Sequence, residues 1–313
     1  MTQHGERVPT GAEIEELLRE RSNWGRWGED DQIGTLNLIT PEKRRAAAGL
    51  VRSGRSVSLS RPLPTQPASN NPRPAEYHLG FHSRIGANQA GTTTDYLGMQ
   101  FHGSSSTHMD ALAHVFTEDG GYNGWSSQDT LSFGGAKRGG IEHCRDGILT
   151  RGVLLDVPRY RGVPYVTQDQ PVHGWELKDV ALAQGVSIEP GDALVINCGR
   201  AAFERENVPY GSGIRKPGAR KPGLHASCLE FLRDTDISVL VWDMLETIPF
   251  GYELHFTVHA AIAAFGLTLV DNAELEALSE ASEAEGRYEF LFTAAPLVMV
   301  GATGSPINPI ANF

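Results

Sequence analysis

FHGSSSTHMDALAHVF, residues 101–116, places three histidines and one aspartate within thirteen residues, among apolar and small neighbours. Such a density of ionisable side chains is typical of a reactive site. If the stretch is extended, its side chains alternate between two faces. The side chains that then share one face are His102, Ser104, Ser106, His108 and Asp110. His108 and Asp110 offer one nitrogen and one oxygen to a divalent metal ion, so the remaining ligands must come from elsewhere in the chain.

The composition limits the classes of function. The chain has 313 residues, of which 40% are hydrophobic and 21% are charged, as in soluble globular proteins. A formal charge of -11 argues against a nucleic-acid-binding surface, which needs clustered Lys and Arg. The three cysteines show no CxxC spacing, so neither a disulfide framework nor a thiolate zinc site is expected.

The N-terminal stretch has no apolar run of secretory length, and nowhere do about 18 apolar residues follow one another. We therefore expect a cytoplasmic protein that does not enter a membrane.

Hydrophobic periodicity predicts alternating helices and strands, and therefore an α/β fold. The expected helices cover residues 14–21 (after a Thr10-x-x-Glu13 capping box), 40–51, 175–185, 225–233, 255–265 and 274–285. The expected strands lie within residues 56–59, 152–157, 188–197, 237–242, 267–270, 288–292 and 294–300. Loops are expected at 62–74 and 117–140, the second of them of the lid type. No linker of disordered composition separates these pieces. We expect an N-terminal arm with helices, residues 1–55, packed on a catalytic domain formed by residues 56–313.

The central stretch resembles a signature of the metal-dependent cyclase family, which includes kynurenine formamidases and isatin hydrolases. That signature reads His-x-Gly-Thr-His-x-Asp-x-Pro-x-His, and residues 104–114 here read SSSTHMDALAH. The positions that match are Thr107, His108, Asp110 and His114. The positions that differ are Ser104 for the first histidine, Ser106 for the glycine and Leu112 for the proline. The resemblance extends to both flanks, in residues 23–31, 34–42, 151–156 and 190–192.

The family's second ligand pair is a histidine followed twelve residues later by a glutamate. Here His259 precedes Asp271 by twelve residues, in the matching context GLTLVD of residues 266–271. Asp271 keeps the charge of the glutamate but is shorter by one methylene. Together with His108 and Asp110, the pair gives two imidazoles and two carboxylates, a set that suits Zn²⁺ or Mn²⁺.

The resemblance also implies a fold and a function. The implied fold is a single-domain swivelling β/β/α fold with a mixed sheet core, assembled as a homodimer or homotetramer. The implied reaction is hydrolysis of a C–N or C–O bond in a small carbonyl substrate, such as a cyclic amide, a lactone or an N-acyl amine. His114 would transfer protons as the catalytic acid and base. The alternative is a non-hydrolytic cyclase, or a small-molecule-binding protein whose metal site is degraded at Ser104.

Three further histidines leave alternatives open. His102 either replaces the missing first ligand from two residues upstream or is a structural histidine, and we prefer the second interpretation. His255 shares a helical face with His259 if both lie in one helix, and would then border the pocket. For His225, as for Tyr122 and Trp125 in the expected lid, packing is the expected role.

Overall fold

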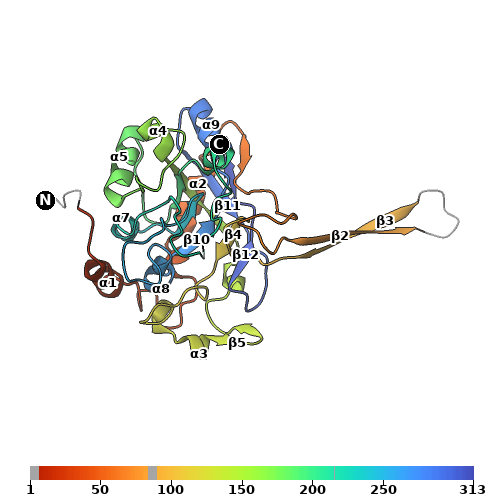
Figure 1. Cartoon of the computed structure of the whole chain (residues 1–313), viewed down its shortest axis with the longest axis horizontal. Helices are drawn as coiled ribbons and strands as arrows, with labels where there is room; N and C mark the ends of the chain where they lie inside the picture. Colours follow the sequence, from red (N-terminus) through yellow and green to blue (C-terminus); the bar gives the residue numbers. More distant parts are fainter. Residues whose placement is uncertain (1–6, 84–89, 215) are drawn as a thin grey trace.

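Four parallel strands form the centre of a mixed nine-stranded sheet in the computed structural model, which describes residues 7–83, 90–214 and 216–313 (Figure 1). The strand order is β1-β13-β11-β7-β8-β9-β10-β4-β12. The parallel strands are β7 (Ile148–Asp156), β8 (Ala193–Asn197), β9 (Val239–Trp242) and β10 (Thr268–Asp271). Their apolar runs follow from burial on both faces, as is usual for parallel strands between helices.

Antiparallel strands extend both sides of this centre. Beyond β10 lie β4 (His108–Asp110) and then β12 (Gly304–Pro306). Beyond β7 lie β11 (Glu289–Ala294), β13 (Ile310–Asn312) and β1 (Ser56–Ser58). The predicted single domain with a mixed sheet core is confirmed.

The sheet separates two hydrophobic cores. Leu240 and Trp242 belong to one core, while their neighbours Val239 and Val241 belong to the other, because side chains alternate along a strand. The first core also contains residues of α5 (Gly174–Gln184), α7 (Cys228–Asp234), α8 (Ala260–Phe265) and α1 (Gly11–Glu20). The second contains residues of α9 (Glu276–Glu285), while α2 (Pro41–Ala48) packs on β7 and β11. The remaining short elements are η1 (Gly34–Leu38), η2 (Tyr122–Gly124), α3 (Ser127–Thr130), β5 (Leu131–Ser132), β6 (Gly135–Ala136), η3 (Ile141–Cys144), α4 (Val157–Arg161) and α6 (Arg200–Glu206).

The N-terminal segment packs closely on α8. The predicted capping box begins α1: the Glu13 amide donates to Thr10 Oγ1 at 3.3 Å, and the Thr10 amide donates to Glu13 Oε2 at 2.7 Å. Further along, Gly34 has a φ of 54°, and a Cβ there would collide with the Gly266 carbonyl oxygen. Only glycine allows this approach of two backbones.

None of the helices in the described parts of the chain is long and apolar enough to span a bilayer.

Two predictions near the C-terminus differ from the structure, one in extent and one in existence. The helix expected at 255–265 begins only at Ala260, because Leu254 and Phe256 pack individually against the first core and hold the preceding segment in an irregular path. The strand expected at 294–300 does not form. Pro296 has no amide hydrogen to donate to a ladder, and the chain forms a loop until β12.

One pair of strands stands out among the elements that were not predicted. β2 (Glu76–Ser83) and β3 (Gly91–Gly98) form an antiparallel ribbon that belongs to neither face of the main sheet and stands clear of the body of the molecule (Figure 1). The sequence of β2, EYHLGFHS, has apolar residues at every second position, and this pattern was the available signal for a strand.

Candidate metal centre

Strand β4 positions the first half of the site. His108 and Asp110 lie on the face opposite to Met109, whose side chain is fully buried in the second core. β4 pairs with β10 so that His108 lies directly opposite Asp271. The alternation predicted from the sequence therefore holds for the three residues of β4, and the strand register brings in a carboxylate from the far end of the chain.

The second half of the site comes from α8 and β10. His259 is the residue that precedes α8, and its Nε2 lies 3.2 Å from Asp271 Oδ2 and 3.8 Å from Asp110 Oδ2. His108 Nε2 lies 3.8 Å from Asp271 Oδ2 and 3.5 Å from Asp110 Oδ1. The structure thus brings together all four residues that the sequence proposed as ligands.

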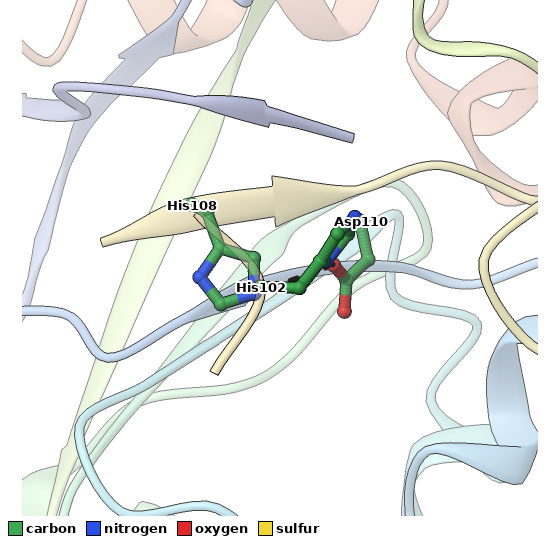
Figure 2. A group of neighbouring side chains, drawn as sticks. All are labelled: His102, His108 and Asp110. Carbon is green, nitrogen blue, oxygen red and sulfur yellow. Dashed lines mark ion pairs between the residues drawn. The ribbon is translucent and has the colours of Figure 1, made fainter. Parts of the chain in front are cut away.

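His102 joins them, although packing was the preferred interpretation of this residue. Its Nδ1 lies 3.0 Å from Asp110 Oδ1, and Figure 2 shows it beside His108 and Asp110. Its Nε2 lies 3.2 Å from Thr303 Oγ1. Its ring also stacks on that of His114, with the ring centroids 3.9 Å apart and the planes at 6°. The structure therefore favours the other interpretation, in which His102 takes the place of the first signature histidine.

Ser104 points away from the site. Residues 101–107 are not extended, because Gly103 turns the chain at a φ of 145°, so the expected alternation fails before β4. The Ser104 carbonyl accepts a hydrogen bond from Arg200 Nη2 at 2.5 Å. Its side chain lies against Gly211, where a Cβ would collide with Ser104 Oγ. The serine at the signature position is thus replaced in space by a histidine from two residues upstream.

A second layer of hydrogen bonds orients the ligands. Glu246 Oε2 lies 2.6 Å from His259 Nδ1, and the Trp242 indole donates to Asp271 Oδ1 at 2.6 Å. His108 Nδ1 lies 2.9 Å from the Ser106 carbonyl, to which it donates. Both imidazoles therefore direct Nε2 inward, as second-layer partners do in metal sites. The sequence interpretation missed Glu246 and Trp242.

The donor atoms fit a metal ion. Both carboxylate oxygens of Asp110 and the Nδ1 of His102 are buried without a hydrogen-bond partner, since the close approach of His102 to Asp110 lacks hydrogen-bond geometry. A buried carboxylate without partners is costly, and a cation satisfies it. Within the part of the chain that the structure describes, two groups of three residues have ligand atoms within 4.8 Å of one another. They are His102, His108 and Asp110, and Asp110, His259 and Asp271. Asp110 is common to both groups.

The charges around the site shift several pKa values. Burial by itself would lower the pKa of His259. The negative charges of Glu246 and Asp271 raise it by more than burial lowers it, so the pKa of His259 lies well above its usual value. Burial lowers the pKa of His114 to about 4, against the opposing effect of Asp110. The His114 side chain is 28% exposed, and its Nε2 lies 3.8 Å from Asp110 Oδ2. At neutral pH this ring is uncharged and can accept a proton.

The remaining candidates lie outside the cluster. His225 has both nitrogens engaged, Nδ1 with the Ser227 amide at 3.0 Å and Nε2 with the Tyr252 hydroxyl at 3.2 Å, so packing explains it. Tyr122 and Trp125 are buried in the first core. His255 shares no helix with His259, but it lines a cavity of about 390 Å³ together with Phe256, whose ring centroid lies 6.4 Å from that of His259.

Comparisons with known proteins identify relatives of the whole chain. The model of the family described as "Putative cyclase" matches residues 57–247. A solved structure described as a novel cyclase is 30% identical, with a TM-score of 0.82, and the match covers 93% of this chain and 99% of that one. An isatin hydrolase bound to the product analogue thioisatinate is 18% identical, with a TM-score of 0.54 over 84% of this chain and 93% of that one. Isatin hydrolase A from Labrenzia aggregata is 15% identical, with a TM-score of 0.54 over 85% and 94%. These two show a shared fold. No curated protein matched the sequence significantly.

Proposed function

Because the chain belongs to the cyclase family, we propose that it is a metal-dependent hydrolase that cleaves a C–N or C–O bond in a small carbonyl substrate. The observation that carries the proposal is Asp110, a fully buried carboxylate whose two oxygens lack hydrogen-bond partners and face four imidazoles. The proteins that share the fold of this chain include isatin hydrolases and a predicted metal-dependent hydrolase from Bacillus stearothermophilus. Their printed descriptions support hydrolysis as the class of reaction.

The residues that would hold a divalent ion, Zn²⁺ or Mn²⁺, are His102, His108, Asp110, His259 and Asp271. When bound, the ion would activate water and polarise the carbonyl group of the substrate. Imidazole nitrogens and carboxylate oxygens without thiolates are the donor set of such ions. Glu246 would keep Nε2 of His259 directed at the site by holding its Nδ1 proton.

His114 would act as the catalytic acid and base. Its uncharged ring accepts the proton of the attacking water and returns it to the leaving nitrogen or oxygen. Stacking on His102 fixes the plane of the His114 ring, while its partial exposure leaves it accessible to a substrate. Substrates that suit this chemistry are cyclic amides, lactones and N-acyl amines, in which one carbonyl carbon is attacked and one C–N or C–O bond breaks.

A substrate screen with a matched variant tests the proposal. Lactones, cyclic imides and N-formyl aromatic amines are offered to protein loaded with Mn²⁺ or Zn²⁺, and ring opening or deacylation is followed. We expect hydrolysis of at least one of these substrate classes. The hydrolysis rate of His114→Ala should be about 10²- to 10⁴-fold lower than that of wild type, while its metal content stays the same. His143→Ala, at an exposed histidine outside the site, is the control. Full activity in His114→Ala would refute the acid/base role, and metal-loaded protein that hydrolyses nothing would point to the non-hydrolytic alternative.

A further inference from the structure

The segment that connects His102 to β4 lies outside the sheet. Within the described part of the chain, residues 102–106 make no backbone-to-backbone hydrogen bond. Several of their carbonyl groups are bound by side chains instead, and a buried carbonyl without a donor is costly. The position of His102 therefore depends on these side chains and not on a strand ladder.

Asn272 binds this segment at two points. Its Nδ2 donates to the Gly103 carbonyl at 2.7 Å and to the Ser106 carbonyl at 3.1 Å. Asn272 directly follows the candidate ligand Asp271 and has a φ of 57°, in the left-handed region that asparagine tolerates. One side chain next to a candidate ligand thus holds both ends of the turn formed by residues 103–106.

Arg200 binds the middle of the same turn. Its Nη2 donates to the Ser104 carbonyl at 2.5 Å, and its Nη1 donates to Asn272 Oδ1 at 2.6 Å. The side chain is fully buried, its Nε donates to Glu204 at 3.0 Å, and its backbone amide donates to Asp243 at 2.8 Å. A buried guanidinium is stable only where its donors find such partners. We call Arg200 and Asn272 together the clamp.

We propose that the clamp positions His102 as a metal ligand, by fixing the turn at 103–106 so that this ring takes the place of residue 104 of the signature. The ring itself is oriented by Thr303 and by stacking on His114, but the backbone that carries it is held by the clamp. The inference rests on the proposed metal-dependent function. Arg200 and Asn272 are positioning residues, because they act through His102.

A clamp that only stabilises the fold is the alternative, since buried polar networks often do so. The two roles differ in their dependence on His102. If the clamp positions this ligand, its effect on metal affinity disappears once the ligand is removed. If the clamp only stabilises the fold, its effect remains.

Asn272→Gly is the test variant, because glycine adopts the left-handed φ without strain and the substitution removes three hydrogen bonds. Asn123→Gly is the matched control. Asn123 has a φ of 54° and also makes three side-chain hydrogen bonds, with Gly25, Gly28 and Glu29, away from the site. Calorimetric titration of Mn²⁺ or Zn²⁺ into chelator-stripped protein should show affinity about 10- to 100-fold lower in Asn272→Gly, as for other residues that orient ligands. Asn123→Gly should bind the ion as wild type does.

A double-mutant cycle then separates the two roles. In the His102→Ala background, the further change Asn272→Gly should weaken binding by less than about twofold, because no ligand is left to position. The visible spectrum of bound Co²⁺, which depends on the ligands and their geometry, should shift in Asn272→Gly towards that of His102→Ala. Arg200→Lys should weaken binding in the same manner, since lysine cannot reproduce the planar fork. Arg205→Lys, at an exposed arginine of the same helix, is its control.

Circular dichroism and thermal unfolding check that each variant is folded, and Arg200→Lys replaces Asn272→Gly in the cycle if the latter does not fold. With metal bound to wild type, equal affinities of Asn272→Gly and Asn123→Gly would overturn the clamp alone. So would an equal loss in the wild-type and His102→Ala backgrounds, which would leave the clamp a purely structural role. A wild type that binds no ion would instead overturn the proposed function, and the clamp with it.

Discussion

Replacing Glu246 by Gln should weaken metal binding without removing any ligand. Glu246 Oε2 lies 2.6 Å from His259 Nδ1, and both side chains are buried. In Glu246→Gln the new side-chain amide oxygen could still accept the Nδ1 proton, but the substitution removes the negative charge that makes the ring a better donor. Substitution of such second-layer partners costs about 10- to 100-fold in metal affinity. That corresponds to about 1.4 to 2.8 kcal/mol of binding free energy.

The assay is calorimetric titration of Mn²⁺ or Zn²⁺ into protein stripped by a chelator. The matched control is Glu176→Gln, which removes a partly buried carboxylate that pairs with Arg161 on another element. Its metal affinity should equal that of wild type. An affinity of Glu246→Gln within twofold of wild type would refute the view that Glu246 tunes His259.

Other substitutions test the site and the fold. His102→Ala should lower metal affinity at least about tenfold, whereas Ser104→Ala should leave it unchanged, because Ser104 faces Gly211; calorimetry showing the reverse order would restore Ser104 as the ligand. His225 has a pKa of about 4 because burial disfavours its charged form, against 6.5 for a free ring, so its neutral form contributes stability above pH 6.5 that is lost as the pH falls through 4. The advantage of wild type over His225→Gln in unfolding free energy should therefore shrink by about 2 kcal/mol between pH 7 and pH 4, allowing for solvent screening, and a constant difference in urea titrations would contradict this. Thr10→Ala removes the cap of α1 and should cost about 1 kcal/mol in the same titrations, where an unchanged midpoint would show that α1 does not need its cap.

The sequence predicted the site where local geometry is regular. His108 and Asp110 share a face because three residues of β4 are extended, and His259 and Asp271 come together because α8 leads directly back into β10. The preferred interpretation of His102 as a structural histidine was not supported. The turn at Gly103 leaves no periodic pattern in the sequence, so the position of a histidine two residues before the signature could not be predicted.

Other contacts between distant segments were not predicted from the sequence. Glu246 lies in a segment without regular periodicity, and only the folded chain brings it to His259, thirteen residues later. The helix predicted at residues 255–265 was too long, since α8 begins only after His259. Packing of Leu254 and Phe256 against the core overrode the local helical pattern. The β2–β3 ribbon escaped notice although Tyr77, Leu79 and Phe81 alternate with polar residues. Its apolar side chains stay exposed in the single chain, so no core packing supports the pattern.

The central claim is that the His and Asp cluster holds a divalent ion, and metal content tests it most directly. Wild type and Asp110→Asn are purified without chelators, equilibrated with Mn²⁺ or Zn²⁺, dialysed, and measured by elemental mass spectrometry. Because Asp110 belongs to both groups of ligands, wild type should retain at least one ion per chain, and Asp110→Asn should retain little or none. A wild type without stoichiometric metal, or an Asp110→Asn variant with the same metal content as wild type, would contradict the account.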